Sequence, residues 1–504
     1  MALRLTGKMP VLRPQAPKGR WNSTMADDGS YEYDLVTIGG GPGGGAAARQ
    51  VARRGGRACI IEASRLGGVC LNVGCIPTKA MLAASDLAWR MRQAGRFGIA
   101  PVEPKVDGPA FMRRVGAVVA ELAGRAEAAV QAGKQIDLIR GRGQLVDAHT
   151  VAVDTPDGPR RVTGRAVVIA TGSSAARPGF LPWDSPRLMT TDEAVTASDL
   201  PASVIVMGGG VIGCEMATVY CELGIPTTVI EMLPGLLPGM DEEAGQAATA
   251  SLTERGAAIL TGRKVLEMSD AGDGACLSGR QVVAKLDDGT AVRAAAALVA
   301  VGRKPNVENI GLEQVGVRVA GGIIPVDDRC RTNVEGVYAI GDVAERRQYA
   351  HLADRMGVVA AENVMGIDLA DDRTVVPVGA YTHPEAASVG LTLAEAKQKH
   401  ASARVFRHSY AHAGMALASG ETHGQVKIVA DLPTGQAGAE SGRIYGALWI
   451  GPHAIDMIQE VALAMRHGLT MAQLYHTIHA HPTFQEGAML AAEGWVSQSI
   501  RKRR

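Results

Sequence analysis

DLVTIGGGPGG, residues 34–44, joins a short run of apolar and β-branched residues directly to a cluster of glycines. Such a run predicts a buried strand, and the Ala-rich residues 46–54 after the glycines predict a helix. A further strand is expected over residues 58–61, and it ends at Glu62. This order of strand, glycine turn, helix, strand and acid is typical of a dinucleotide-binding unit.

The same pattern occurs a second time. VIVMGGGVIG, residues 204–213, leads into a helix-like stretch over 214–223, and a strand over 227–230 ends at Glu231. In each copy the first glycine permits a tight turn, the second lets the backbone approach a pyrophosphate, and the third allows close helix–strand packing. Two such sites on one chain imply a flavin and a nicotinamide cofactor, and the predicted glycines are Gly39, Gly41 and Gly44 for the first and Gly208, Gly210 and Gly213 for the second.

The two acids predict how the nucleotides are held. Glu62 and Glu231 each follow the first glycine of their motif by 23 positions, where a carboxylate accepts hydrogen bonds from ribose hydroxyls. A 2′-phosphate would be repelled by Glu231, and no Lys or Arg lies between Ile230 and Glu254. NAD(H) is therefore favoured over NADP(H).

Two cysteines lie in GGVCLNVGCIPTK, residues 67–79. Metal binding is disfavoured, because no second Cys or His pair with zinc spacing follows. In a regular helix, Cα atoms five residues apart are roughly 8–9 Å apart, whereas a disulfide needs less than about 7 Å. The segment must then leave regular helix, which Gly74 and Pro77 allow. We interpret Cys70 and Cys75 as a reversible disulfide beside the flavin, and the other cysteines as structural: Cys59, Cys214, Cys221, Cys276 and Cys330.

This cysteine segment resembles the active-site motif of the pyridine nucleotide-disulfide oxidoreductases, and most closely that of their dihydrolipoamide dehydrogenase branch. The resemblance extends from about residue 33 to about residue 493. It implies an α/β fold with two Rossmann-like dinucleotide-binding domains, for FAD and NAD, and a C-terminal α+β interface domain that forms a homodimer. The expected divisions are a basic, disordered extension over 1–32, FAD-binding parts over 33–175 and 298–373, an NAD-binding domain over 176–297 and the interface domain over 374–504.

Three shorter motifs extend the resemblance. VIATGS (168–173) is similar to the strand and turn that close the first FAD segment, and VGRKPN (301–306) is similar to the junction after the NAD domain. VYAIGD (337–342) is similar to the second FAD motif, whose Asp binds the ribityl chain. These motifs imply further cofactor contacts at Thr171, Gly172, Ser173, Gly341 and Asp342 for FAD and at Gly302 for NAD.

The resemblance also implies the catalytic roles. Cys75 corresponds to the thiolate that lies against the flavin, and Cys70 to the interchange thiol that exchanges with the substrate. Lys79 corresponds to the lysine near flavin N5, where its charge stabilises the reduced flavin. Glu215 corresponds to the ion-pair partner of that lysine.

A base is expected in HAHPTFQE, residues 479–486. Thiol–disulfide exchange proceeds through thiolates, so a group must accept the substrate's proton, and imidazole titrates in the right range. His481 with Glu486, five positions later, matches the family's dyad, and His479 is the main competitor. Phe484-Gln485 departs from the Leu-Ser usual in the dihydrolipoamide branch, and the polar stretch 433–442 and both extended termini depart from the family as well.

These features predict an NAD-dependent enzyme that oxidises protein-bound dihydrolipoyl groups through the disulfide and FAD. The partner would be a lipoylated carrier protein or a small dihydrolipoyl substrate. The alternatives are a reductase of another disulfide or of a metal ion, and a flavoprotein that binds nucleotide without turnover. A mercuric reductase is disfavoured, because no Cys follows Cys330.

Composition narrows the remaining classes. The 52 basic and 51 acidic side chains leave a net charge of +1, which argues against a nucleic-acid binder. The sequence contains no run of about 18 apolar residues, so no membrane-spanning helix is predicted. No metal site is expected. We expect a cytoplasmic protein, with an organellar matrix as the alternative if the basic N-terminus is a presequence.

Overall fold

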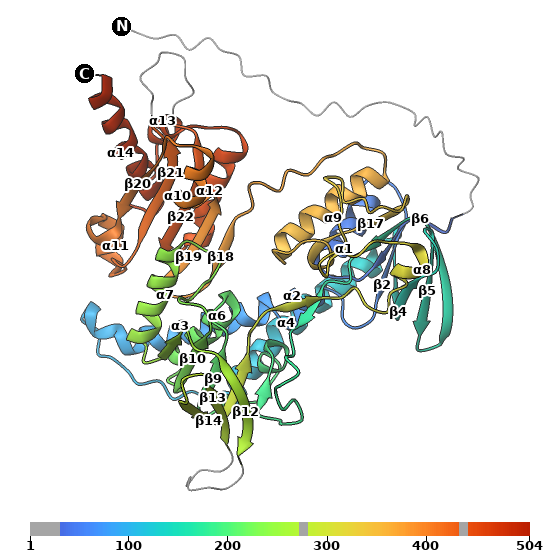
Figure 1. Ribbon diagram of the computed structural model, residues 1–504, viewed down its shortest axis with the longest axis horizontal. Coiled ribbons are helices and arrows are strands. Elements are labelled where there is room, and N and C mark those ends of the chain that lie inside the picture. Colours follow the sequence, from blue (N-terminus) through green and yellow to red (C-terminus); the bar gives the residue numbers. More distant parts are fainter. Residues whose placement is uncertain (1–30, 272–280, 433–441, 504) are drawn as a thin grey trace.

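The computed structural model describes residues 31–271, 281–432 and 442–503. Three units are visible in Figure 1: blue, teal and gold elements form the first domain, green elements the second, and orange and red elements the third. The chain thus leaves the first domain and later returns to it. The predicted extension up to residue 30, Cys276 and residues 433–441 of the predicted polar stretch lie outside the described residues.

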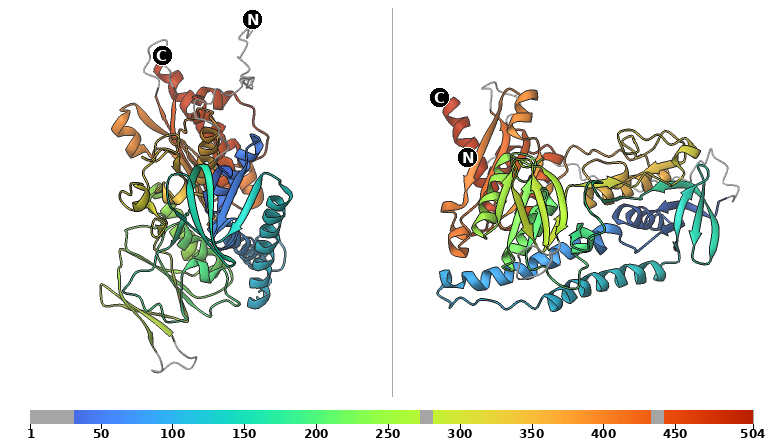
Figure 2. Two further views of the ribbon diagram at one scale, coloured as in Figure 1. Left: turned by 90° about the vertical axis from the view of Figure 1, so that its right-hand side faces the viewer. Right: turned by 60° about the horizontal axis from the view of Figure 1, so that its bottom comes forward.

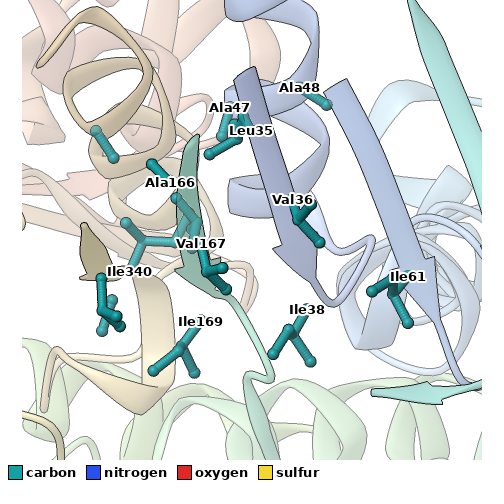
Figure 3. Packing of buried hydrophobic residues seen from close by; sticks show 14 of the residues in the cluster. Leu35, Val36, Ile38, Ala47, Ala48, Ile61, Ala166, Val167, Ile169 and Ile340 are labelled. Carbon is teal, nitrogen blue, oxygen red and sulfur yellow. The ribbon is translucent and has the colours of Figure 1, made fainter. Parts of the chain in front are cut away.

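The first domain is built on a seven-stranded sheet in the order β3-β2-β1-β6-β5-β4, with β17 also paired to β6. The strands are β1 (Tyr33–Ile38), β2 (Ala58–Glu62), β3 (Ile136–Arg140), β4 (Arg142–Leu145), β5 (Thr150–Thr155), β6 (Gly158–Ile169) and β17 (Val337–Ala339). Its parallel centre is β3-β2-β1-β6-β17. Leu35, Val36 and Ile38 pack there against Val167 and Ile169, and all five are buried (Figure 3).

Helices cover this sheet and extend from it. They are α1 (Pro42–Arg53), α2 (Gly68–Asn72), α3 (Cys75–Gln93), α4 (Gly108–Ala132), α8 (Leu312–Val315) and α9 (Ala350–Val364), with 3-10 turns η1 (Ala94–Phe97) and η2 (Gly341–Val343). α1 packs along α9. In the right-hand view of Figure 2, the long helix α3 runs below the second domain and α4 extends towards the first domain. α3 packs against α4 and against α6 of the second domain.

The second domain repeats the parallel arrangement. Its sheet has the order β11-β10-β9-β15-β8. The strands are β8 (Leu188–Met189), β9 (Val204–Met207), β10 (Thr227–Glu231), β11 (Ala258–Thr261) and β15 (Ala296–Val299), and the helices are α5 (Thr191–Ala194), α6 (Val211–Glu222) and α7 (Glu242–Glu254). An antiparallel sheet of β12 (Val265–Ala271), β13 (Gln281–Leu286) and β14 (Ala291–Ala294) is added to it, and β15 crosses the domain division expected at 297. The chain enters the second domain after β7 (Ser173–Ala175) and leaves it at β16 (Arg303–Pro305), and these two strands pair antiparallel.

Both predicted helices after the glycines are present, but they begin earlier than expected. α1 begins at Pro42, not residue 46, and α6 begins at Val211, not residue 214. The reason is that Gly41 and Gly210 are themselves the extended N-cap residues, so each helix starts inside its glycine motif. Pro42 suits the first helical position, where a backbone N–H has no intrahelical partner.

The third domain is an antiparallel sheet covered by helices. Its strand order is β18-β19-β22-β21-β20. The elements are β18 (Val378–Ala380), β19 (Glu385–Gly390), β20 (Ala403–Ser409), β21 (Gln425–Asp431), β22 (Ile444–Gly451), α10 (Leu393–Lys399), η3 (Tyr410–His412), α11 (Gly414–Ser419), α12 (Ala454–Arg466), α13 (Met471–His476) and α14 (Glu486–Arg503). Within the described ranges, no helix combines the length and apolar character needed to cross a membrane.

Candidate active site

The first glycine of each motif occupies a position that other residues could not. Gly39 and Gly208 have φ of +111° and +109°, in the region that favours glycine. A Cβ on Gly39 would lie 2.3 Å from the Ala170 carbonyl oxygen, and one on Gly208 would lie 2.4 Å from that of Ala300. The turn therefore passes against the neighbouring strand end in both domains.

The third glycine of each motif is in close contact with the turn, whereas the second has open space beside it. A Cβ on Gly44 or Gly213 would lie 2.0 or 1.9 Å from the carbonyl oxygen of the first glycine, so helix and turn are in close contact. A Cβ on Gly41 would have nothing nearer than 3.9 Å, and one on Gly210 nothing within 4 Å. The backbone at these two positions is accessible to a ligand, as the pyrophosphate role requires.

The two acids at the ends of β2 and β10 fasten their turns in the same way. Glu62 accepts hydrogen bonds from Gly40 N at 2.8 Å and Ser64 N at 2.7 Å. Glu231 accepts them from Gly209 N at 2.6 Å and from the N–H of residue 233 at 2.8 Å. A carboxylate oxygen can accept more than one hydrogen bond, so both acids keep acceptor capacity for a ribose hydroxyl.

Basic residues lie closer to Glu231 than the sequence indicated. β11 pairs with β10 so that Glu231 is opposite Thr261, and the N–H of Arg263 donates to the carbonyl oxygen of Glu231 at 3.0 Å. Arg263 and Lys264 line the same cavity as Glu231. The sequence argument counted neighbours along the chain and so missed neighbours across the sheet. The guanidinium of Arg263 is paired with Asp288 at 2.8 Å, which offsets part of its charge.

Replacing Glu231 is expected to change nucleotide use. In Glu231→Ala, kcat/KM for NAD⁺ should fall about 10- to 100-fold, because a charged hydrogen-bond acceptor is lost. Glu231→Arg should additionally raise the rate with NADP⁺. Steady-state kinetics with both nucleotides measure this, and unchanged FAD content serves as the control for folding. A preference for NADP⁺ in the unmodified protein would contradict the charge argument.

One large cavity joins the two nucleotide turns to the cysteines. Its volume is about 2130 Å³, larger than the roughly 300–1,000 Å³ typical of a small-molecule pocket. Of the predicted site residues, Gly213, His481 and Glu486 do not line it. The others do: Gly39, Gly41, Gly44, Glu62, Cys70, Cys75, Lys79, Thr171, Gly172, Ser173, Gly208, Gly210, Glu215, Glu231, Gly302, Gly341 and Asp342.

The three shorter motifs meet at one place on this cavity. Ser173 Oγ donates to Asp342 Oδ2 at 2.6 Å and accepts from Arg303 Nε at 2.8 Å. Thr171 Oγ1 donates to the Asn306 carbonyl oxygen at 2.8 Å. Arg303 and Asn306 were not among the predicted site residues, although both lie in the quoted 301–306 motif. Arg303 reaches the second FAD motif through Ser173, and Asn306 ties its own segment to Thr171.

The cysteine segment leaves regular helix, as the distance argument required. α2 ends at Asn72 and α3 begins at Cys75, and the break falls at Val73-Gly74, where Gly74 has φ −132° and ψ −109°. Pro77 was expected to contribute, but it lies in the first turn of α3, where its missing N–H breaks no helical hydrogen bond. The break therefore lies at Val73 and Gly74, whose backbones both leave the helical region, and not at Pro77. The other described cysteines, expected to be structural, are buried: Cys59, Cys214, Cys221 and Cys330.

The two thiols are unlike in charge. The hydrogen bond from the Cys70 thiol, helped by the Lys79 ammonium and opposed by burial, lowers the pKa of Cys75 below the usual thiol range. The same hydrogen bond, together with burial, raises the pKa of Cys70. In the dithiol form, Cys75 is therefore the more acidic of the two thiols.

This hydrogen bond predicts a pH effect. In Cys70→Ser the hydroxyl still donates to Cys75, whereas Cys70→Ala removes the donor. Because a donor stabilises the charged form, the thiolate should appear at higher pH in Cys70→Ala, by about one to two units. The absorbance of the Cys75 thiolate against oxidised flavin, followed against pH in both holoproteins, measures the midpoints. Equal midpoints would contradict the assigned hydrogen bond.

Lys79, on α3 of the first domain, contacts residues of the second and third domains. Its Nζ lies 2.7 Å from Glu215 Oε2 of α6, and the Glu215 side chain is only 3% exposed. Glu215 Oε1 accepts from Tyr381 N at 3.0 Å, and the Lys79 ammonium lies 4.4 Å from the centroid of the Tyr381 ring. Sequence reasoning identified Lys79 and Glu215 but missed Tyr381.

The predicted dyad lies on the third domain. His481 Nδ1 is 2.9 Å from Glu486 Oε1, and Thr483 N donates to Glu486 Oε2 at 2.9 Å. Although burial opposes the charge, these hydrogen bonds lower the pKa of Glu486, which stays a carboxylate beside the ring. The His481 side chain is 77% exposed, whereas His479 is 5% exposed and has both ring nitrogens paired. The geometry therefore favours His481 over its competitor.

Comparison with known proteins places these features in one family. The pyridine nucleotide-disulfide oxidoreductase profile matches residues 33–357, and the dimerisation-domain profile of the same family matches residues 376–492. The chain belongs to this family. Its members of this type use FAD and NAD(H), for which the two glycine turns and the common cavity provide the sites.

Individual relatives match this disulfide oxidoreductase over nearly its whole length. It is 37% identical to a dihydrolipoyl dehydrogenase of Bacillus subtilis over 92% of this chain and 98% of the relative. It is 36% identical to the dihydrolipoyl dehydrogenase of Chlamydia pneumoniae over 92% of this chain and 97% of the relative. Among solved structures, LpdA from Mycobacterium tuberculosis superposes with a TM-score of 0.82 at 27% identity, over 91% of this chain and 98% of LpdA. A Cu(II) complex of the HOCl-induced flavoprotein disulfide reductase RclA from Escherichia coli superposes with a TM-score of 0.80 at 25% identity, over 92% and 99%.

Proposed function

We propose that this oxidoreductase is a dihydrolipoamide dehydrogenase, which oxidises protein-bound dihydrolipoyl groups and reduces NAD⁺. The observation that carries the proposal is the dithiol of Cys70 and Cys75 on one cavity with both nucleotide turns and with the Lys79–Glu215 pair. Curated relatives named dihydrolipoyl dehydrogenase, which match nearly the whole chain, support the choice of substrate. The role of each site residue and the domain divisions are part of this proposal.

The chemistry at the cysteines follows from their charges. His481 accepts the proton of one substrate thiol, and the resulting thiolate attacks Cys70 Sγ. The Cys70–Cys75 bond breaks, and Cys75 leaves as a thiolate that the Lys79 ammonium stabilises. The second substrate thiol, deprotonated in turn, attacks the first substrate sulfur, so the lipoyl disulfide forms and Cys70 is released and protonated. FAD, which the turn at Gly39, Gly41 and Gly44 would hold, would supply the electron transfer from the dithiol to NAD⁺.

The base would come from a second subunit. His481 and Glu486 do not line the cavity that holds the cysteines, and the His481 ring is largely exposed. In a two-fold dimer each chain presents the same surface, so one chain's dyad can face its partner's cysteines. The dimerisation-domain match over residues 376–492, which include the dyad, supports this homodimeric site.

Buried free thiols, among them Cys59 and Cys221, suit a reducing compartment such as the cytoplasm.

A second candidate is a reductase of another disulfide, as the likeness to RclA allows. Glu231 at the nucleotide turn disfavours NADPH as its electron donor. Steady-state rates separate the two: NADH formation from NAD⁺ with free dihydrolipoamide and with lipoylated carriers, against NADPH oxidation with oxidised glutathione. Faster turnover with a lipoylated carrier than with free dihydrolipoamide would also identify the partner. Turnover with glutathione and NADPH alone would contradict the proposal.

A further inference from the structure

A second His–Glu pair lies beside the dyad. His479 Nε2 is 2.9 Å from Glu460 Oε1, and Gln485 Nε2 donates to Glu460 Oε2. Both oxygens of this one carboxylate are thus taken by side chains of the loop that carries His481. We call Glu460, His479 and Gln485 the Glu460 clamp.

The clamp fastens the loop on both sides of the base. The loop spans residues 477–485, between α13 and α14, and His479 precedes His481 by two positions whereas Gln485 follows it by four. Glu460 lies on α12, whose residues Ile458 and Val461 are fully buried in the core of the third domain. The clamp therefore ties an exposed loop to a rigid helix.

A separate contact fixes the end of the loop nearest α14. Tyr410, which is fully buried, donates from its hydroxyl to the Phe484 carbonyl oxygen at 2.9 Å, and the two rings pack with centroids 5.3 Å apart. Among the described residues, the His481 ring itself is hydrogen-bonded only to Glu486. The direction in which the ring points is then set by how firmly the loop is held.

We propose that Glu460 is a positioning residue for the base, acting through His479 and Gln485 to hold His481 at the distance that proton transfer requires. The inference rests on the proposed function, because it assigns His481 the role of base. A displacement of about 1 Å at a reacting group can cost about 100-fold in rate. Gln485 is one of the departures from the Leu-Ser of the related branch, and its longer side chain adds a tie to α12.

The test separates the step that needs the base from the step that does not. Reduction of the oxidised holoenzyme by a dithiol uses His481, whereas reduction by NADH does not. Glu460→Ala is expected to slow reduction by dihydrolipoamide and by dithiothreitol about 10- to 100-fold and to leave reduction by NADH and FAD content unchanged. Glu460→Gln should retain an intermediate rate, since its side-chain amide can still form a hydrogen bond with His479. Gln485→Ser should lose less than Glu460→Ala, because the His479–Glu460 pair remains.

Stopped-flow absorbance of the flavin measures these rates, with Glu493→Ala, an exposed carboxylate on α14, as the matched control. Equal rates for the unmodified protein and Glu460→Ala with both dithiols would overturn the proposal. So would a parallel fall in the NADH rate with loss of FAD, which indicates a structural role, or a loss in His479→Ala as large as in His481→Ala. The unmodified protein could instead be reduced by NADH and by dithiothreitol but not by dihydrolipoamide. That result would contradict the proposed substrate, and the rates with dithiothreitol would still test the clamp.

Discussion

Cys75→Ser is expected to abolish both the long-wavelength absorbance of the two-electron-reduced holoenzyme and its turnover. The absorbance requires a thiolate against the flavin, and Cys75 is the thiol whose pKa the Cys70 hydrogen bond and Lys79 lower. Cys70→Ser should keep the absorbance, because Cys75 remains, yet lose turnover, because the thiol that exchanges with substrate is gone. Each variant should lose dihydrolipoamide:NAD⁺ activity by about 1,000-fold or more.

Anaerobic titration with NADH, followed by visible spectra, distinguishes the two cysteines. Cys221→Ala provides a control, since this buried thiol does not line the cavity and its removal should leave the absorbance in place. Long-wavelength absorbance that survives Cys75→Ser would contradict the assignment of the two sulfurs.

Subunit mixing should restore activity to two inactive variants. Cys70→Ser lacks the exchange thiol, and His481→Ala lacks the base, whose loss should cost about 100- to 10,000-fold. If each site combines the cysteines of one chain with the dyad of the other, a mixed dimer has one site with both lesions and one with neither. Activity should then rise from near zero towards half of the unmodified rate per mixed dimer.

The control for this experiment is proof that subunits exchange. Differently tagged chains, mixed under the same conditions and separated by affinity, report the fraction of mixed dimers. Full exchange without recovery of activity would mean that each active site is built within a single chain.

The nucleotide turns could be predicted because their determinants are local. The backbone angle that requires glycine at positions 39 and 208 is a property of those positions themselves, whereas the strand ends beside them, at Ala170 and Ala300, come from distant parts of the chain. The helix starts were predicted less well, since Gly41 and Gly210 were assigned only to the turn and not recognised as N-caps.

The cysteine segment shows that the presence of helix-breaking residues does not predict where a helix is broken. The distance between helical positions five apart correctly required a break, but it did not say which residue supplies it. The backbone leaves the helical region at Val73 and Gly74, whereas Pro77 falls in a first helical turn, where proline is tolerated. Which of two candidate breakers acts depends on where the next helix begins.

Contacts between distant segments could not be predicted from the sequence. Tyr381 meets Glu215 across 166 positions, and it reaches Lys79 only because the third domain packs against α3 and α6. Arg263 is brought towards Glu231 by the pairing of two strands, and Glu460 meets His479 by the packing of α12. Such contacts depend on how sheets and helices pack, which periodicity along one segment does not encode.

The most direct test of the account is reduction of the oxidised holoenzyme by dihydrolipoamide alone, followed anaerobically by stopped-flow absorbance. The account predicts that two electrons enter through Cys70 and that the long-wavelength absorbance of the Cys75 thiolate appears before any nucleotide is added. Addition of NAD⁺ should then discharge it with formation of NADH. If dihydrolipoamide fails to produce this long-wavelength absorbance, although NADH produces it at once, the proposed function is contradicted.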